Sequence, residues 1–298
     1  MPSPTVVLVP GSNSNSFSWA PLQRDLALRG VRSLAVDLPA HGFGATWPAG
    51  YQAPQDAAAL ARVPSAAAGV TVQHAVDHLV DVVTRAREHG PVVVVGHSRG
   101  GLPLTGLLST APELVDRAVY ISAWCPVAAT VAEYLDSPEY ADSALNRLPN
   151  ILTADPAELG ALRMNWRTGD PAALAALKES MLADGTDDEF LAFLALLDAD
   201  EILDPGERAD VERWGSVARS YVRLIADTSM PLALQDRLIA DADAMTPARP
   251  FDVHTLDGSH VGFLVREAPR AEAADLLAAL AAATPSPTGE AVGSGSVS

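Results

Sequence analysis

The sequence predicts an α/β protein with a mostly parallel six-stranded sheet flanked by helices. Two observations carry this prediction. Short apolar runs of strand length alternate along the chain with helix-length amphipathic segments, which is the pattern of βα units. One such run, residues 92–95, enters a glycine-rich turn and then a helix-compatible segment, residues 102–110. The alternation stops at a helix-rich block, residues 127–216, which predicts a helical lid inserted into the sheet.

The first four strands come before this block. Residues 45–69, rich in Ala, Pro and Gly without a sustained period, predict a long excursion at the carboxyl edge of the sheet, either a pocket wall or a tolerated insertion. The strands are expected at residues 5–9, 31–37, 92–95 and 118–122, and the helices at 19–29, 71–89 and 102–110.

Regular alternation resumes after the block. Strands are expected at residues 220–226 and 250–256, and helices at 231–241 and 266–283. The predicted organisation is therefore an α/β core made of residues 1–126 and 217–283, a lid of residues 127–216, and a disordered Gly, Ser and Pro-rich tail of residues 284–298.

Composition excludes several classes of function. A net charge of −17 over 298 residues argues against a nucleic-acid partner, because phosphate binding requires a basic surface. No apolar run approaches the ~20 residues that a membrane helix needs. The single cysteine, Cys125, excludes an intramolecular disulfide, and the first residues lack a basic and apolar leader. We therefore expect a cytoplasmic protein that does not bind membranes, and its assembly is compatible with a homodimer.

The glycine-rich turn Gly96-His-Ser-Arg-Gly100 matches G-x-S-x-G. Between a buried strand and a helix, this motif resembles the nucleophile elbow of α/β hydrolases, in which a sharp turn exposes a serine hydroxyl. Ser98 is therefore the candidate nucleophile. The alternative is a Gly-rich turn without chemistry.

A serine hydroxyl needs a base to take its proton and a third group to orient that base. In α/β hydrolases the acid and then the histidine follow the serine, each after a later strand. His260 lies in the loop beyond the last strand, whereas His254 lies within that strand, so His260 is the candidate base. Asp227 directly follows the preceding strand and is the candidate acid. Its rivals are Asp204, Asp252 and Asp257.

Acyl transfer also needs donors for the oxyanion. The backbone N–H of Arg99, just after the nucleophile, supplies one, and the backbone N–H of Ser12, in the loop after the first strand, supplies the other. The guanidinium of Arg99 is unfavourable at a helix N-terminus. Either a carboxylate neutralises it, which we favour, or it binds an acidic substrate.

Two further groups of polar residues are interpreted as structural. His74 and His78 lie one helical turn apart, as in a zinc site, but they lie opposite the apolar face of their helix and no further ligand is evident, so no metal is predicted. Asp37 and His41 precede the serine and are assigned to the turn after the second strand. No cofactor is predicted.

Aromatic side chains commonly line apolar pockets, and each of those in this chain could equally be core or lid packing. The candidates are Phe17, Trp124, Trp166, Trp214 and Phe263.

The chain is identified as a member of the α/β-hydrolase superfamily over residues 5–283, and within it resembles the bacterial esterase relatives of plant hydroxynitrile lyases and methyl-salicylate-type esterases. The likeness rests on a chain that begins at the strand before the oxyanion loop, on the sequence from Val7 to Trp19, and on Val36-Asp-Leu-Pro-Ala-His-Gly42. Pro10 departs from the family, which has a histidine there. The excursion and the lid are also longer than in the plant lyases. The resemblance implies a triad of Ser98, Asp227 and His260.

The predicted function is hydrolysis of a carboxylic ester or lactone, a small-molecule substrate, through an acyl-enzyme. One alternative is lyase or other non-hydrolytic chemistry with the same triad. The related lyases place a lysine in the pocket, whereas Lys178, the one lysine here, lies in the predicted lid. A non-enzymatic binding protein with a hydrolase fold is a third alternative, although such proteins typically lose a triad member and this chain retains all three.

Overall fold

The computed structural model describes residues 3–149 and 151–284. Most of the predicted tail, residues 285–298, lies outside the described residues. Thr284, the first residue assigned to that tail, is instead buried, and its hydroxyl donates to the carbonyl of Leu280 at 2.8 Å. Thr284 therefore packs with the end of the last described helix.

Six strands of the described chain form one sheet in the order β2-β1-β3-β4-β7-β8, and all five pairings are parallel. The predicted six-stranded sheet is confirmed. Val6 and Leu8 face one side of the sheet and Val7 and Val9 the other, and all four are fully buried. Burial on both faces explains why these strands are continuous apolar runs. The strands are β1 (Thr5–Val9), β2 (Arg32–Ala35), β3 (Val92–Ser98), β4 (Arg117–Ala123), β7 (Ala218–Leu224) and β8 (Asp252–Leu256).

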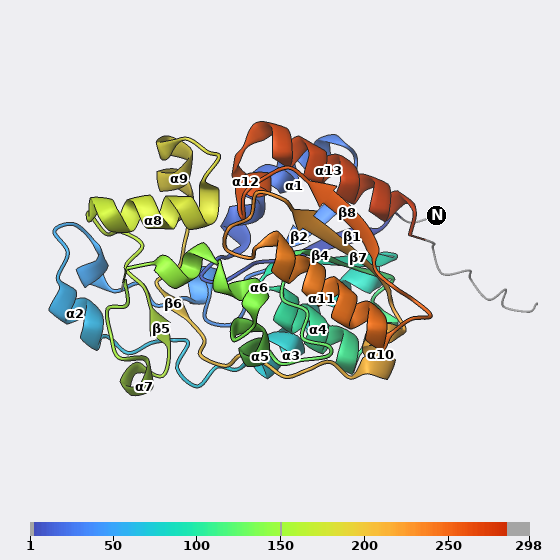
Figure 1. The fold of residues 1–298 in the computed structure, drawn as a ribbon, viewed down its shortest axis with the longest axis horizontal. Coiled ribbons are helices and arrows are strands. Elements are labelled where there is room, and N and C mark those ends of the chain that lie inside the picture. Colours follow the sequence, from blue (N-terminus) through green and yellow to red (C-terminus); the bar gives the residue numbers. More distant parts are fainter. Residues whose placement is uncertain (1–2, 150, 285–298) are drawn as a thin grey trace, which may run out of the picture.

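Helices cover both faces of this sheet (Figure 1). The face with Val6 and Leu8 packs against α1 (Ala20–Leu28), α12 (Gly262–Val265) and α13 (Glu267–Ala282). The opposite face packs against α3 (Val72–Arg87), α4 (Gly101–Thr110), α10 (Val211–Gly215) and α11 (Leu232–Met245). A one-turn 3-10 helix, η1 (Ser16–Trp19), precedes α1, and η4 (Pro112–Leu114) follows α4.

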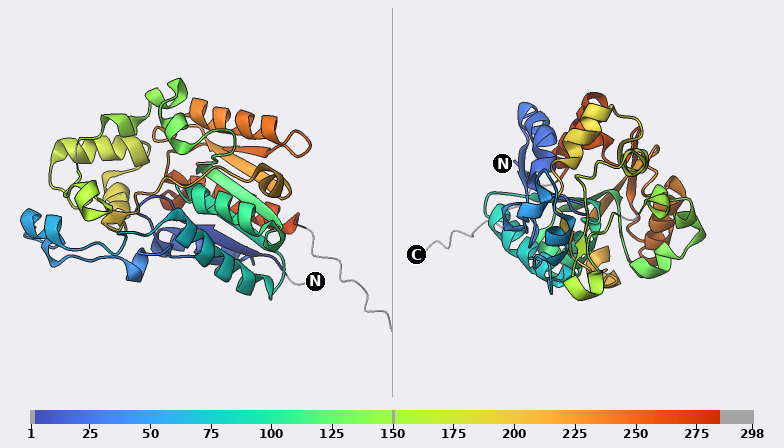
Figure 2. Two further views of the ribbon diagram at one scale, coloured as in Figure 1. Left: turned by 90° about the horizontal axis from the view of Figure 1, so that it is seen from below. Right: turned by 90° about the vertical axis from the view of Figure 1, so that its left-hand side faces the viewer.

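The segment between β4 and β7 is mainly helical, but it also contains a short antiparallel ladder that the sequence did not indicate. Figure 2 shows that α8 and α9 extend beyond one end of the sheet, on the same side of the molecule as α2. The division into core and lid stays a prediction. The elements are α5 (Val131–Leu135), α6 (Pro138–Ala141), η5 (Ala144–Arg147), α7 (Pro156–Leu159), β5 (Leu162–Arg163), α8 (Pro171–Leu182), α9 (Asp187–Leu194) and β6 (Asp200–Glu201).

The excursion of residues 45–69 forms η3 (Ala49–Tyr51) and α2 (Ala57–Arg62), after η2 (Gly42–Gly44). Arg163 of β5, fully buried, donates to the carbonyls of Leu60 at 2.7 Å and Val63 at 2.6 Å. It also forms a two-bond ion pair with Asp200 of β6, at 2.6 and 2.7 Å. The excursion is thus hydrogen-bonded to the segment between β4 and β7 through Arg163.

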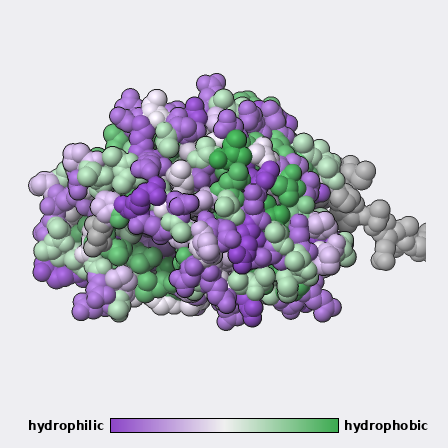
Figure 3. Space-filling view, in the orientation of Figure 1, coloured by the Kyte–Doolittle hydropathy of each residue, from purple (hydrophilic) through white to green (hydrophobic). Residues whose placement is uncertain are grey.

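The face of the molecule drawn in Figure 3 is largely hydrophilic, with hydrophobic residues grouped in a few patches. Among the described residues, none of the helices combines the length and the apolar content needed to cross a membrane.

Candidate active site

Ser98 is the last residue of β3, and its φ of +52° is a left-handed conformation that side chains rarely adopt. The loops around it approach so closely that glycine is required. A Cβ on Gly100 would lie 2.5 Å from the carbonyl oxygen of Pro10, and one on Gly96 would lie 2.8 Å from the carbonyl oxygen of Gly100. The strained turn and its two glycines present Ser98 at the carboxyl edge of the sheet.

The structure brings the three residues predicted as a triad into one chain of hydrogen bonds. Oγ of Ser98 lies 2.9 Å from Nε2 of His260, and Nδ1 of His260 lies 2.6 Å from Oδ2 of Asp227. Because an ionised carboxylate only accepts, Nδ1 carries the proton, and Nε2 is left to accept from the serine hydroxyl. All three side chains are at least nine-tenths buried. This arrangement can remove a proton from Ser98.

Asp227 is held by further donors. Its Oδ2 accepts from the hydroxyl of Ser122 at 2.6 Å, and its Oδ1 accepts from the backbone N–H groups of Ser229 and Met230 at 2.8 and 2.9 Å. These bonds fix the carboxylate against rotation. The rival acids are engaged elsewhere or exposed: Asp204 accepts from the backbone of Val72, Asp252 lies beside His254, and Asp257 is exposed.

His97 supports the loop that carries His260. It is buried, and its Nε2 donates to the backbone carbonyl of His260 at 3.0 Å. Burial, and secondarily the charge of His260, lower the pKa of His97 well below its usual value. A neutral His97 can therefore lie 4.6 Å from the imidazole of His260, ring centre to ring centre, without opposing a positive charge there.

The two predicted oxyanion donors flank the nucleophile. Ser12 lines the same cavity as Ser98, and Arg99 follows it in the turn. Neither backbone N–H donates a hydrogen bond to another residue that the structure describes. Both remain available for a negatively charged oxygen next to Oγ of Ser98.

The guanidinium of Arg99 faces away from this cavity. Its Nε lies 3.6 Å from Oε1 of Glu201, and its Nη2 donates to the carbonyls of Ile202, at 3.1 Å, and Asp204. A carboxylate therefore compensates this cation, which is the interpretation that we favoured over an acidic substrate.

Ser98 lies at one end of an apolar cavity, which has a volume of about 300 Å³. Its polar end is formed by Ser98, His260 and the loop at residues 11–14. None of the other described residues that line it carries a formal charge at neutral pH. The apolar lining consists of Leu145, Leu148, Leu162, Met164, Trp166, Met181, Phe193, Leu197 and Val261.

Of the five aromatic residues predicted to line a pocket, only Trp166 lies in this lining. Its backbone N–H donates to the hydroxyl of Tyr51 at 3.0 Å, so the excursion supports the cavity wall from outside. Two alternatives were open for the excursion, a pocket wall or a tolerated insertion, and it contributes a residue behind the cavity wall but none to the lining.

The other four predicted aromatic residues do not line this cavity, and their rings pack elsewhere. Phe17 is 41% exposed and lies edge-on to Phe43, with 5.4 Å between ring centres. Trp124 packs against Tyr140.

The remaining two rings are fully buried in the core. Trp214 lies under the sheet, where its Nε1 donates to the hydroxyl of Tyr120 at 2.9 Å. Phe263 packs between Trp19 and His97, with ring centres 5.8 and 5.0 Å away.

The residues interpreted as structural lie outside the cavity lining. His74 completes the N-terminal cap of α3 by accepting from the backbone N–H of Thr71. Asp37 accepts from the backbone N–H of Ser16 at 2.7 Å. Within residues 3–149 and 151–284, no group of three His, Cys, Asp or Glu side chains is arranged to hold a metal ion.

Three polar residues near the site were missed in the sequence: His97, Ser122 and Glu201. His97 stands beside the nucleophile, and that adjacency was a usable signal. Ser122 and Glu201 gave none, because their partners lie 105 and about 190 positions away. The aliphatic lining was also missed, since such residues cannot be told from core residues by pattern.

Comparisons with known proteins support the same fold. Methylesterase 1 from Arabidopsis thaliana is 30% identical over 120 residues, which is 40% of this chain and 39% of that protein. The aligned region thus spans about two fifths of the plant relative. Among solved structures, a variant of the pyrethroid hydrolase PytH superposes with a TM-score of 0.66 at 20% identity, covering 94% of this chain and 99% of that one. Polyneuridine aldehyde esterase superposes with a TM-score of 0.63 at 21% identity, covering 93% and 99%.

The family model described as alpha/beta hydrolase family matches residues 6–276. The match includes all six strands except Thr5, and the residues from Ser12 to His260 that surround the cavity. The similarity to a plant methylesterase and to polyneuridine aldehyde esterase agrees with the plant esterase branch predicted from the motifs. This chain belongs to the alpha/beta hydrolase family.

Proposed function

We propose that this protein is a carboxylic-ester hydrolase that cleaves an ester or lactone through an acyl-enzyme on Ser98. The observation that carries the proposal is the hydrogen-bonded series of Ser98, His260 and Asp227 at the polar end of an apolar cavity. No metal or organic cofactor is needed for this chemistry.

The first half-reaction transfers the acyl group to the enzyme. Nε2 of His260 takes the hydroxyl proton while Oγ of Ser98 forms a bond to the carbonyl carbon. The carbonyl oxygen becomes an oxyanion, which accepts from the N–H groups of Ser12 and Arg99. When the C–O bond to the alcohol breaks, His260 gives its proton to the leaving oxygen.

The second half-reaction releases the acid. His260 takes a proton from water, whose oxygen attacks the acyl carbon, and returns it to Oγ of Ser98 as the ester to the enzyme breaks. Asp227 keeps Nδ1 protonated and stabilises the imidazolium in both halves. The products are the carboxylic acid and the alcohol.

The cavity points to an uncharged substrate with one bulky apolar group. Its described lining offers no cation to pair with a carboxylate of the substrate and no anion to pair with an amine of the substrate. Burying an unpaired charge there would be costly, whereas an aliphatic or aromatic group gains from leaving water. The names of the relatives, a methylesterase, a pyrethroid hydrolase and polyneuridine aldehyde esterase, support an ester as the substrate class.

The test is hydrolysis of p-nitrophenyl esters and labelling by a fluorophosphonate. Ser98→Ala should abolish labelling and reduce kcat by about 10⁶-fold, and Asp227→Asn should reduce kcat by about 10⁴-fold because it leaves the imidazole in the wrong tautomer. Asp252→Asn is the control for the acid, since Asp252 lies on the neighbouring strand outside the site. Unchanged turnover in Ser98→Ala would overturn the proposal.

The lyase alternative finds no support in the cavity. Lys178 lies on α8, where its Nζ contacts Asp187 at 2.5 Å, and it does not line the cavity. The cytoplasmic location and the homodimer stay predictions from the sequence.

A further inference from the structure

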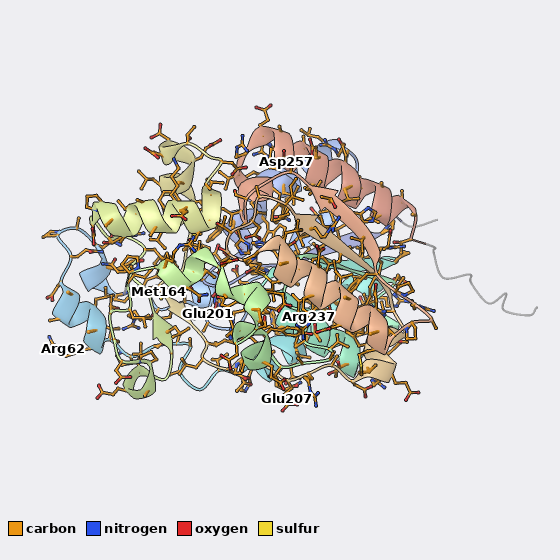
Figure 4. The ribbon with its side chains drawn as sticks, viewed as in Figure 1. Arg62, Met164, Glu201, Glu207, Arg237 and Asp257 are labelled. Atoms are coloured by element: carbon orange, nitrogen blue, oxygen red, sulfur yellow. The ribbon has the colours of Figure 1, made fainter. Side chains whose placement is uncertain are left out.

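Glu201 is a buried carboxylate that the proposed mechanism does not use. It lies in β6, where the segment between β4 and β7, here called the inserted segment, meets the sheet (Figure 4). Its side chain is 4% exposed. Its Oε2 accepts from the backbone N–H of Asn13 at 2.7 Å and from the hydroxyl of Ser12 at 3.1 Å. Its Oε1 accepts from the backbone N–H of Ile202 at 2.8 Å. One carboxylate thus joins β6 to the loop that carries the proposed oxyanion donor.

Two cations compensate this buried charge. Nε of Arg99 lies 3.6 Å from Oε1, and Nε2 of His41 lies 3.6 Å from Oε2. Burial alone would raise the pKa of Glu201, but His41, Arg99 and the N–H of Asn13 together outweigh burial, and the pKa falls to about 2. Glu201 therefore stays ionised and accepts hydrogen bonds at any pH at which an esterase is assayed.

The loop needs such support. Asn13 has a φ of +54°, which is uncommon for a residue with a side chain. The backbone N–H of Asp198 donates to the carbonyl of Asn13 at 2.7 Å, and the side-chain amide of Asn13 donates to the carbonyl of Asp198 at 3.0 Å. Asp198 and Glu201 therefore hold both the N–H and the C=O of Asn13.

We propose that Glu201 is a positioning residue, which fixes the loop at Ser12 and Asn13 so that the N–H of Ser12 points at the oxyanion. The inserted segment then shapes the oxyanion hole as well as the apolar cavity. This inference rests on the proposed function. Because the oxyanion exists only in the transition state and intermediate, the loss of Glu201 should lower kcat and leave KM nearly unchanged.

The test compares Glu201→Gln with Asp200→Asn. Glutamine keeps the size but has an NH₂ where one oxygen stood, so either Asn13 or Ile202 loses its acceptor, and Arg99 and His41 lose their counter-charge. Asp200 is the matched control, because it is the neighbouring residue of β6, equally buried and ion-paired, and it bonds Arg163 and Ser65 but not the oxyanion loop.

kcat and KM are measured with a p-nitrophenyl ester, and the concentration of active sites is determined by titration with a fluorophosphonate. In Glu201→Gln we expect kcat to fall by about 10- to 100-fold with KM within about threefold, a smaller effect than removing an oxyanion donor outright. The inhibition constant of a trifluoromethyl ketone, which forms a tetrahedral adduct on the serine, should rise by the same factor as kcat falls. Asp200→Asn should lower the thermal midpoint but leave kcat, KM and the inhibition constant within about threefold of the wild-type values.

Unchanged kcat and trifluoromethyl ketone affinity in Glu201→Gln, with an active wild type, would overturn this inference alone. A wild type that neither hydrolyses esters nor reacts with the phosphonate would overturn the proposed function and this inference with it. If Glu201→Gln does not fold, Ser12→Ala replaces it, because it removes the hydroxyl bond to Glu201 and retains the backbone N–H of Ser12. We expect kcat to fall by about fivefold at unchanged KM, and no fall would overturn the inference.

Discussion

The hydroxyl of Ser122 donates a 2.6 Å hydrogen bond to the carboxylate of Asp227, on the same oxygen that accepts from His260. Ser122 is fully buried near the end of β4 and has a φ of +37°. A left-handed serine here costs backbone strain, and its side chain is aimed at the proposed acid. The neighbouring strand therefore contributes to orienting the imidazole, although it provides no member of the triad.

Ser122→Ala should lower kcat by about 10-fold, because a hydrogen bond to a charged group stabilises by roughly 1.5 to 3 kcal/mol and three other donors remain on Asp227. The measurement is kcat with a p-nitrophenyl ester. Ser220→Ala is the control, since Ser220 is an equally buried serine of the sheet whose hydroxyl donates to Asp252, outside the site. Equal kcat in the wild type and both variants would contradict the role of Ser122.

Met164→Trp should shift substrate preference towards small acyl groups. Met164 lines the apolar part of the cavity, so the larger tryptophan side chain should fill part of the cavity volume of about 300 Å³. We expect kcat/KM for a p-nitrophenyl decanoate to fall by at least about 10-fold, while the acetate changes by less than about threefold. An equal loss of kcat/KM for both esters would show that the acyl group of the substrate does not occupy this cavity.

Arg163→Met should destabilise the fold by about 3 to 5 kcal/mol, because it leaves the buried carboxylate of Asp200 without its partner. It also removes the donors to Leu60 and Val63 that fasten the excursion. Urea unfolding measures the loss. The double variant Arg163→Met with Asp200→Leu should recover part of it, since no unpaired charge remains, and failure to recover any would contradict the ion-pair explanation.

The stability of the protein should fall with rising pH through His41. Burial lowers its pKa, but the adjacent Glu201 carboxylate, together with the carbonyl of Pro39 and the charge of Asp198, outweighs burial and raises the pKa to about 9. The ordinary value is 6.5. The folded state therefore holds the proton more tightly than the unfolded state, so the contribution is complete below pH 6.5 and is lost as pH rises through about 9.

The free energies of unfolding of the wild type and of His41→Gln, measured by urea denaturation from pH 6 to 10, check this. The difference between the two free energies should shrink over that interval, by an amount on the order of 3 kcal/mol at most. A difference that does not vary with pH would show that folding does not raise the pKa of His41.

Much of the fold was predictable because its signals are local. Each buried strand is an apolar run, and the elbow, Asp227 and His260 lie next to the ends of such runs. The bounds moved where backbone geometry decides them: β3 was expected to end at Val95 but continues to Ser98, where the left-handed turn stops it. Topology then places the carboxyl ends of β3, β7 and β8 at one edge.

The parts that could not be predicted depend on distant partners. Asp200 and Glu201 form a strand although their sequence is acidic, because Arg163 and the oxyanion loop bind them across the fold. Four of the five aromatic candidates lie outside the cavity lining for a related reason. A ring such as Trp214 or Phe263 can fill the core as well as a cavity, and composition does not distinguish the two.

The position of β8 has a consequence for how the enzyme would lose activity. Among the strands that the structure describes, β8 is an outer strand that pairs with β7 alone, and the proposed base follows it by four residues. Outer strands open locally at lower free energy than central ones. Fraying of β8 would carry His260 away from Ser98 while β1, β3 and β4 stay paired. In mild denaturant, catalysis would then vanish before the circular dichroism of the sheet changes.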